Sequence, residues 1–267
     1  MDCIIGLYAY NIQVKLKYLL NSITNLTNVF NKIKFIVSYD KSSDNTLGLL
    51  NEINIPNVDV IILNYINNVG GLQRTKRYAN ARNLILDEIR NNYSSIPYFI
   101  MLDINEYTID TKIDIDLIQN IMQRNDWDAI CFNRSSGFSD IWSLSYDPYI
   151  YSVLHFQSWN RVAEKVREEI ANLILEYRMN KSSELIPVLS AYNGFMIYRT
   201  HLFINSSYES EIDKTLFPDG SIDKEVELVG FNIANHTINE SEHRPFHLKA
   251  VRDNNVRIRI CPKFLMI

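Results

Sequence analysis

The sequence predicts a single α/β domain in which helices flank a mixed, mostly parallel sheet. Residues 1–135 alternate apolar runs of strand length with segments of helical period, which is the pattern of consecutive βαβ units. A length of 267 residues allows one compact body with a sizeable buried core. Hydrophobic residues make up 46% of the chain and charged residues 22%, a composition typical of ordered globular proteins.

Five strands are expected in this alternating region, because short apolar runs favour buried strands. We predict them at Cys3–Ala9, Ile33–Tyr39, Val58–Leu63, Tyr98–Leu102 and Ala129–Phe132. Apolar residues recur at helical spacing between Leu16 and Leu26 and again between Ala81 and Ile89, so each stretch should lay one face on the sheet. We expect residues 1–135 to form a nucleotide-binding half.

The alternation ends after Ser135, where an irregular stretch rich in tryptophan and tyrosine begins. An amphipathic helix is expected from about Trp159 to Tyr177, because its apolar residues share one face. A last strand, from Val256 to Ile260, should end at Pro262 and lie half-exposed at the sheet margin. We expect residues 136–267 to form the acceptor-side half of the same domain.

The charge distribution limits the partners. The net charge is -4 and the chain has no long basic run, so we expect no nucleic-acid partner. A short basic cluster contains Arg74, Lys76, Arg77 and Arg82. Four cations suit a small phosphorylated ligand such as a nucleotide better than a polyanion.

The cysteines and the hydropathy pattern indicate the compartment. Cys3, Cys131 and Cys261 lie apart in apolar segments, so we expect buried thiols and neither a disulfide framework nor a zinc site. The first apolar run is too short for a signal peptide, and no stretch of about 18 apolar residues occurs. We expect an intracellular, cytoplasmic protein without a membrane span.

Three polar clusters follow predicted strands, where ligands bind in open α/β sheets. The first runs from Asp40 to Thr46 after the second strand. Within it, Asp44 or Ser43 suits the cap of the next helix, and a carboxylate here also suits a base or ribose. The residues alone leave both roles open for Asp44.

The second cluster runs from Gln73 to Asn83 and follows Gly70 and Gly71. It brings cations to the start of a helix, where the helix dipole also favours a diphosphate. A solvated helix face is an equally good interpretation, because charge runs are usually just that.

The third cluster, Asp103-Ile104-Asn105-Glu106, places oxygen ligands directly after an apolar strand. A hard cation such as Mg²⁺ or Mn²⁺ prefers carboxylates together with phosphate oxygens. The same residues are also ordinary turn and capping residues, so the spacing alone does not decide between the two roles.

The order of these clusters resembles the GT-A glycosyltransferases, which have a Rossmann-like nucleotide-sugar fold. The resemblance covers nearly the whole chain and is strongest to the glycosyltransferases related to the fungal capsule protein CAP59 and to those of giant DNA viruses. Two later segments support it, Ala191 to Arg199, similar to the loop that lines the donor sugar, and Glu242-His243-Arg244-Pro245-Phe246-His247, similar to a Glu-His-x-x-Phe-His signature. A viral protein in the host cytoplasm fits this resemblance.

The resemblance implies a role for each matching residue. Asp40 and Asp44 lie near the nucleoside, Arg74, Arg82 and Asn83 near the diphosphate, and Asn193 and Gly194 near the donor sugar. Asp103 and Asn105 would bind Mn²⁺ or Mg²⁺. Asn105 departs from the Asp-x-Asp pattern, and its neutral amide binds a dication less strongly than a carboxylate.

The resemblance also assigns the carboxyl-terminal segment. Glu242 stands where inverting members carry the carboxylate that takes the acceptor proton, with His243 beside it. His243 or His247 is the candidate third metal ligand, and we assign His243 to catalysis and His247 to the metal. A further histidine, found in many GT-A members after the last strand, is missing from this sequence.

These inferences predict a metal-dependent glycosyltransferase that moves a sugar from a UDP- or GDP-sugar to a hydroxyl of a glycan or protein. One alternative is a weak or inactive nucleotide- or sugar-binding protein, suggested by Asn105 and the missing histidine. A nucleotidyltransferase is a second alternative, but Tyr8-Ala9-Tyr10-Asn11 is not the Gly-rich loop that such enzymes need.

Overall fold

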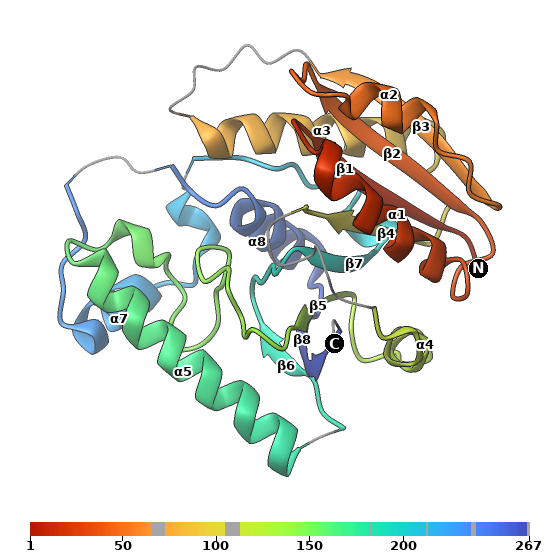
Figure 1. Cartoon of the computed structure of the whole chain (residues 1–267). Coiled ribbons are helices and arrows are strands. Elements are labelled where there is room, and N and C mark those ends of the chain that lie inside the picture. The colour runs from red at the N-terminus through yellow and green to blue at the C-terminus, as the bar shows by residue number, and fades with distance from the viewer. Residues whose placement is uncertain (66–72, 105–112, 182, 212, 236–238, 266–267) are drawn as a thin grey trace.

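The computed structural model describes residues 1–65, 73–104, 113–181, 183–211, 213–235 and 239–265 (Figure 1). Its strands form one sheet of eight in the described part of the chain. They are β1 (Cys3–Ala9), β2 (Ile33–Asp40), β3 (Val58–Tyr65), β4 (Tyr98–Leu102), β5 (Ala129–Asn133), β6 (Ile186–Val188), β7 (Phe195–Arg199) and β8 (Ile258–Phe264).

Helices connect most of these strands. The α-helices are α1 (Gln13–Leu26), α2 (Thr46–Asn51), α3 (Arg74–Asn92), α4 (Ile115–Met122), α5 (Trp159–Asn180), α6 (Thr200–Phe203), α7 (Ser221–Val229) and α8 (His243–Asn254). Two short 3-10 turns, η2 (Val153–His155) and η3 (Lys214–Leu216), lie among them. Figure 1 shows α1 and α2 at the β1–β3 end of the sheet, and α5 and α7 beside its other end.

The sheet is mixed, with the strand order β3-β2-β1-β4-β7-β5-β8-β6. Strands β1 to β4 pair in parallel, whereas β7 runs antiparallel between β4 and β5. Strand β8 returns parallel to β5, and the short edge strand β6 pairs antiparallel to it. The carboxyl ends of β1, β2 and β4 therefore meet at one edge, where ligands bind in sheets of this kind.

Two hydrophobic cores cover the two faces of the sheet. On β1, Cys3, Ile5 and Leu7 pack into the core that contains α1 and α4, while Ile4 packs into the core that contains α3. This alternation follows from the two-residue period of a strand. Gly6 faces α3, and a Cβ atom there would lie 2.9 Å from Ile85 Cγ2. The close approach of α3 thus depends on this glycine.

The predicted α/β class is confirmed, and strands β1 and β4 have the predicted bounds. The prediction was wrong for β7, because the segment from Ala191 to Arg199 was interpreted as a loop. Residues Phe195 to Arg199 form a buried strand near the middle of the sheet. Only the four residues from Ala191 to Gly194, just before the strand, are in loop conformation.

The end of the last strand was also predicted wrongly, because β8 continues through Pro262 to Phe264. β6 pairs with β8 only as far as Ile260, so the missing N–H of Pro262 breaks no ladder bond on that side. At this end of the sheet the edge strand is β6, so β8 lies one strand inside the edge. Its residues Ile258, Ile260 and Cys261 are buried rather than half-exposed.

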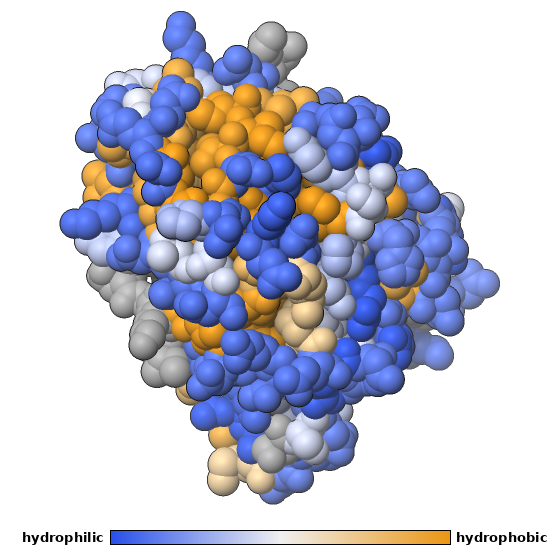
Figure 2. All heavy atoms as spheres, turned by 90° about the vertical axis from the view of Figure 1, so that its right-hand side faces the viewer, coloured by the Kyte–Doolittle hydropathy of each residue, from blue (hydrophilic) through white to orange (hydrophobic). Residues whose placement is uncertain are grey.

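Figure 2 shows the side that carries the N-terminal end, where hydrophobic residues form a broad upper area and a smaller lower one among hydrophilic residues. Cys3, Cys131 and Cys261 are buried free thiols, as predicted. Among the described helices, we find none with the length and apolar character that a membrane crossing requires.

Candidate active site

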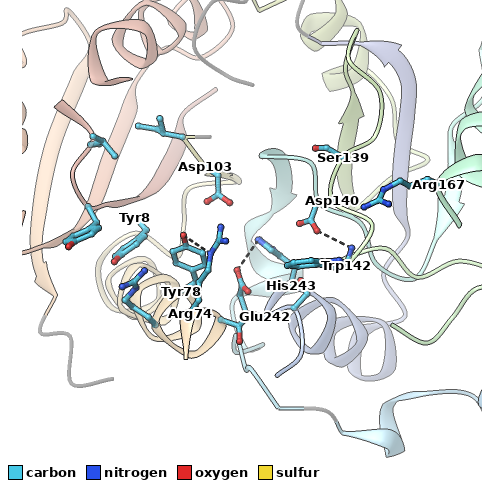
Figure 3. A pocket seen from close by; sticks show the side chains of 16 residues that line it. Tyr8, Arg74, Tyr78, Asp103, Ser139, Asp140, Trp142, Arg167, Glu242 and His243 are labelled. Carbon is cyan, nitrogen blue, oxygen red and sulfur yellow. Dashed lines mark hydrogen bonds and ion pairs between the residues drawn. The ribbon is translucent and has the colours of Figure 1, made fainter. Parts of the chain in front are cut away.

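A cavity of about 630 Å³ opens at the carboxyl ends of β1 and β4 (Figure 3). This size lies within the usual range of small-molecule sites. It is lined by Tyr8, Tyr10, Ile12, Arg74, Thr75, Arg77, Tyr78, Asp103, Ile104, Ser139, Asp140, Trp142, Arg167, Ser241, Glu242 and His243. Figure 3 shows the first turns of α3 on one side, the loop with Ser139 and Asp140 on the other, and α8 below.

Arg82 links two of the three acidic residues that line the cavity. Its Nη2 donates to Asp103 Oδ1 at 2.7 Å, and its Nη1 donates to Glu242 Oε1. The guanidinium is 2% exposed and does not line the cavity, whereas the Asp103 side chain is 33% exposed. The sequence placed Arg82 beside a diphosphate; in the structure it is a buried ion-pair partner of the two carboxylates.

Glu242 is a carboxylate with an unusual proton affinity. Burial raises its pKa to about 7, the Arg82 guanidinium opposes this rise, and the Asp103 and Asp140 carboxylates add to it. A group with a pKa near neutrality accepts and releases protons readily at physiological pH. The structure thus brings together Asp103, Arg82 and Glu242, three of the residues singled out in the sequence.

His243 lies beside Glu242 and has an unsatisfied ring. Both ring nitrogens are buried, and neither has a hydrogen-bond partner in the described part of the chain. The ring stacks on Tyr192 with centroids 3.6 Å apart, and Nε2 lies 3.9 Å from Glu242 Oε1, too far for a hydrogen bond. Burial lowers the pKa of His243 well below its usual value, so the imidazole is neutral.

His247, predicted as a metal ligand, does not lie at the cavity. Its Nδ1 is 2.8 Å from Ser190 Oγ, and its Nε2 is 3.0 Å from Tyr198 Oη. Burial lowers its pKa to about 3. Because α8 turns by roughly 100° per residue, residues four apart share one face, but here the second histidine lies deeper in the core. The structure therefore does not bring His247 to Asp103.

Cations and aromatic rings form the α3 side of the cavity. Arg74 Nε donates to Tyr78 Oη at 3.2 Å, and the Arg77 guanidinium lies 5.6 Å from the centre of the Tyr10 ring. Arg77 Nε is buried and has no hydrogen-bond partner among the described residues. Tyr8 packs edge-on against Tyr78, with ring centres 5.3 Å apart. This side thus offers both positive charge and ring surface.

The two aspartates of the first cluster have different positions. Asp40 is buried at the end of β2 and accepts a hydrogen bond from Tyr8 Oη at 2.7 Å, so it touches the cavity through that ring. Asp44 accepts from the backbone N–H groups of Thr46 and Gln13, the first residues of α2 and α1. The structure thus places Asp44 in a helix-capping position and outside the cavity lining.

The remaining predicted residues support the cavity from behind. Asn83 exchanges two hydrogen bonds of 2.8 Å with the backbone of Tyr208. Asn193 Oδ1 accepts from the Ser139 N–H and hydroxyl, and the Gly194 carbonyl accepts from Asp103 N–H at 2.9 Å. None of the three lines the cavity. Asn105 lies outside the described residues.

The sequence analysis did not single out the polar residues of the opposite wall, among them Asp140. Burial raises the pKa of Asp140 to about 6, and the Asp103 carboxylate contributes to this rise. Trp142 and Arg167 line the same wall. The local signal was weak, because Asp140 lies in an irregular stretch seven residues after the end of β5, whereas Asp103 follows β4 directly.

The donor groups at the cavity limit how a metal ion could bind. Among the described residues, no group of three or more His, Cys, Asp or Glu side chains is arranged to hold a metal ion. At the cavity, Asp103 supplies an oxygen donor, the type that Mn²⁺ and Mg²⁺ prefer, and the unpaired neutral ring of His243 supplies a nitrogen donor.

Comparisons with known proteins identify the fold. No protein-family model matches the chain, and a search of curated proteins finds no match. The 1–349 fragment of S. aureus TarS is similar to the whole chain, with a TM-score of 0.50 and 16% identity. The same fragment in complex with UDP gives 0.51 and 14%. The galactosyltransferase LgtC matches 97% of the chain, with a TM-score of 0.37 and 12% identity.

The TarS likeness establishes the architecture as the GT-A fold of glycosyltransferases, as the sequence predicted. The chain spans 59% of the length of the TarS fragment. Identity at this level shows the fold and leaves the activity to be argued from the site.

Proposed function

We propose that this chain is a glycosyltransferase that moves a sugar from a nucleoside diphosphate sugar to a hydroxyl group of a glycan or protein, with help from a divalent metal ion. The observation that carries the proposal is the cavity itself. Arginines at the start of α3 line it together with the Asp103 and Glu242 carboxylates. A TarS fragment of the same fold forms a complex with UDP, which supports a uridine donor as the first choice over a GDP-sugar.

The donor would occupy the α3 side. Helix α3 is 19 residues long, and its first residues, Arg74 and Thr75, line the cavity. The positive end of the helix dipole and the guanidinium groups of Arg74 and Arg77 together favour a diphosphate there. Tyr8 and Tyr10 offer ring faces to the nucleoside, and Asp40 holds the Tyr8 hydroxyl in place.

The metal ion would be held by Asp103 and His243, with Asn105 as a further oxygen donor. A bound dication supplies charge that stabilises the departing diphosphate. Burial is the main cause of the raised pKa values of Glu242 and Asp140, and the Asp103 carboxylate adds to both, so an added cation is favourable. His243 suits the metal better than His247, whose nitrogens are both engaged.

Glu242 would act as the base. As the acceptor oxygen attacks the anomeric carbon of the donor sugar, its proton passes to the Glu242 carboxylate, and the bond to the diphosphate breaks. A pKa of about 7 suits this transfer near neutral pH. Arg82 keeps the carboxylate oriented toward the cavity before the proton arrives. Arg74 and Arg77 neutralise the charge that develops on the leaving group.

The test is a thermal-shift screen of UDP- and GDP-sugars with and without Mn²⁺, followed by an assay for release of the free nucleoside diphosphate. A ligand at about 100 times its Kd stabilises the folded state by about 2.7 kcal/mol, which raises the Tm. We expect a Mn²⁺-dependent shift for one donor that disappears in Asp103→Ala and persists in the control Asp223→Ala, an exposed residue on α7.

The outcomes separate the alternatives. Release of nucleoside diphosphate from the shifting donor supports the enzyme. A donor that binds but is never cleaved, with any acceptor, favours a nucleotide- or sugar-binding protein. The absence of a shift with every donor, in a chain that unfolds cooperatively, would exclude the donor site.

A further inference from the structure

The wall opposite α3 has no role in the donor site. Figure 3 shows Ser139, Asp140, Trp142 and Arg167 grouped there, across the cavity from Tyr8, Arg74 and Tyr78. The first three come from the loop after β5, and Arg167 comes from α5. The wall thus combines an aromatic ring, a carboxylate, a hydroxyl and a cation on one surface.

Trp142 is an exposed aromatic residue at the cavity. Its side chain lines the cavity and is 41% exposed, whereas neighbouring Ile141 and Leu144 are buried. A large ring that faces a polar cavity leaves apolar area in contact with water. A ligand with an apolar face and polar edges, such as a pyranose, would cover that ring while its hydroxyls stay hydrogen-bonded.

Asp140 fixes the position of Trp142 and keeps one oxygen for a ligand. Its Oδ1 accepts from Trp142 N–H at 3.2 Å and from Ser143 N–H at 3.3 Å, which forms an Asx turn. The Ser143 hydroxyl also interacts with this carboxylate, and among the described residues no backbone N–H bonds to Oδ2. The turn therefore accounts for one carboxylate oxygen only, and the other oxygen is available at the cavity lining.

The wall is held by buried polar contacts, so it is built before any ligand arrives. The Asn193 side chain accepts two hydrogen bonds from Ser139. Ser143 Oγ donates to the Asp140 and Tyr192 carbonyls, and the Ser190 hydroxyl donates to the Ser143 carbonyl at 2.6 Å. A wall fixed in this way loses little conformational entropy when a ligand binds.

The charges of the cavity indicate what kind of ligand the wall favours. Asp103, Asp140 and Glu242 place three carboxylates around the space in front of it. Arg167 lines the wall, is exposed, and makes no ion pair with a described residue. Arg82 already pairs with Asp103 and Glu242, so the wall itself carries one carboxylate, Asp140, and one exposed cation. An acidic ligand therefore meets no excess of positive charge there.

We propose that Trp142, Asp140 and Arg167 form an acceptor subsite for a neutral hexopyranose, the terminal sugar of a glycan. The sugar stacks its apolar face on the Trp142 ring and donates a hydroxyl to Asp140 Oδ2. Arg167 donates to one of its oxygens. This inference rests on the proposed glycosyl transfer, and it narrows the acceptor from any hydroxyl compound to a neutral glycan.

The test measures binding of methyl glycosides by saturation-transfer NMR in the presence of UDP. The probes are the methyl β-D-glucoside, galactoside and mannoside, with the methyl β-D-glucuronide as the acidic counterpart. Loss of one ring-stacking contact should weaken binding of the preferred neutral glycoside about tenfold in Trp142→Ala. Trp159→Ala is the matched control, because Trp159 is 46% exposed and does not line the cavity.

A second variant tests the carboxylate without removing the turn. In Asp140→Asn the amide oxygen still accepts from Trp142 and Ser143, but the second oxygen is replaced by a donor. We expect weaker glycoside binding and an unchanged UDP thermal shift. Equal binding in Trp142→Ala and Trp159→Ala, no binding of any neutral glycoside, or preference for the glucuronide would overturn the subsite.

The donor measurement keeps the two proposals distinguishable. If the wild type binds UDP but the glycosides do not depend on Trp142, the subsite fails and the donor site stands. If the glycosides bind through Trp142 but no nucleotide sugar binds or is cleaved, the transfer reaction fails and the chain is a glycan-binding protein.

Discussion

The two walls of the cavity are built by different means. On the α3 wall, site residues lie on regular elements or at their ends, as Arg74 does at the start of α3 and Asp103 just after β4. On the opposite wall the backbone is irregular and is held by buried side chains. Arg244 of α8 donates to the carbonyls of Leu144 and Ile150, and Glu225 of α7 accepts from Tyr151 N–H at 2.5 Å.

This difference predicts where the molecule is sensitive to mutation. Hydrophobic burial and ladder hydrogen bonds are spread over many residues, so the α3 wall tolerates the loss of an exposed polar group such as Arg74. Buried Arg82 is the exception, because its ion pairs join α3 to Glu242 and Asp103. The opposite wall depends on a few buried charges, and an unpaired buried charge is costly. Arg82, Glu242 and Glu225 allow this contrast to be tested.

The largest effect is expected at Glu242, where the two walls meet. Glu242→Gln keeps the size and one acceptor oxygen for Arg82 but cannot take up a proton. We expect kcat for glycosyl transfer to fall about 10²- to 10⁴-fold, with donor Kd changed little. Steady-state kinetics together with UDP titration measure both quantities. A fall confined to donor affinity would assign Glu242 to binding.

The next effect is on stability. Arg82→Ala removes the cation shared by Glu242 and Asp103 and should lower the free energy of unfolding by about 3–5 kcal/mol. Arg74→Ala, an exposed arginine on the same helix, should change it by less than about 0.5 kcal/mol. Urea unfolding of both variants gives the comparison. Similar values for the two would mean that the buried ion pairs contribute little.

The pH dependence of stability should come largely from Glu225, which holds the wall opposite α3. Burial raises the pKa of Glu225 to about 7 from 4.5, so the folded state holds a proton that the unfolded state has lost between these values. The free energy of unfolding then falls as pH rises from about 4.5 to 7 and stays low above. This group contributes a fall of up to about 3 kcal/mol.

Glu225→Gln isolates this contribution. Urea unfolding from pH 5 to pH 8 should show a smaller fall in the variant than in the wild type. Glu227→Gln, an exposed position on the same helix, should follow the wild type. A fall of the same size in Glu225→Gln would mean that other groups produce the pH dependence.

The smallest effect separates the two roles of the first acidic cluster. Asp44→Ala removes the acceptor of the Gln13 and Thr46 N–H groups and should cost about 1–2 kcal/mol of stability, with UDP affinity unchanged. Asp40→Asn weakens the contact that orients Tyr8, so it should reduce UDP affinity. Reversed results for the two variants would return Asp44 to the nucleoside site.

The sequence predicted the α3 wall well, because the patterns that determine its elements are local in sequence. Apolar runs determined β1 and β4, helical spacing determined α1 and α3, and Asp103 follows its strand directly. The kinship to CAP59-related and viral enzymes stays a prediction. The wall opposite α3 depends on contacts between residues distant in sequence, such as Asn193 with Ser139 and Arg244 with Leu144. Hydrophobic periodicity does not predict contacts of this kind.

Residue type alone also failed to separate the two histidines of α8. His243 and His247 are both buried, and only the Ser190 and Tyr198 hydroxyls decide that His247 is engaged. Likewise, the sequence could not show that Arg82 is buried and paired with two carboxylates of the cavity lining.

The dipeptide Asn193–Gly194 has a consequence for which substrates fit. Gly194 adopts a φ of 86°, and its carbonyl holds the backbone of Asp103, while the preceding Asn193 side chain holds Ser139. Two consecutive residues therefore anchor both walls, and hydrogen bonds to this dipeptide set the separation of Asp103 and Ser139. Selection by ligand width follows, since a wider sugar cannot spread the walls without breaking these bonds.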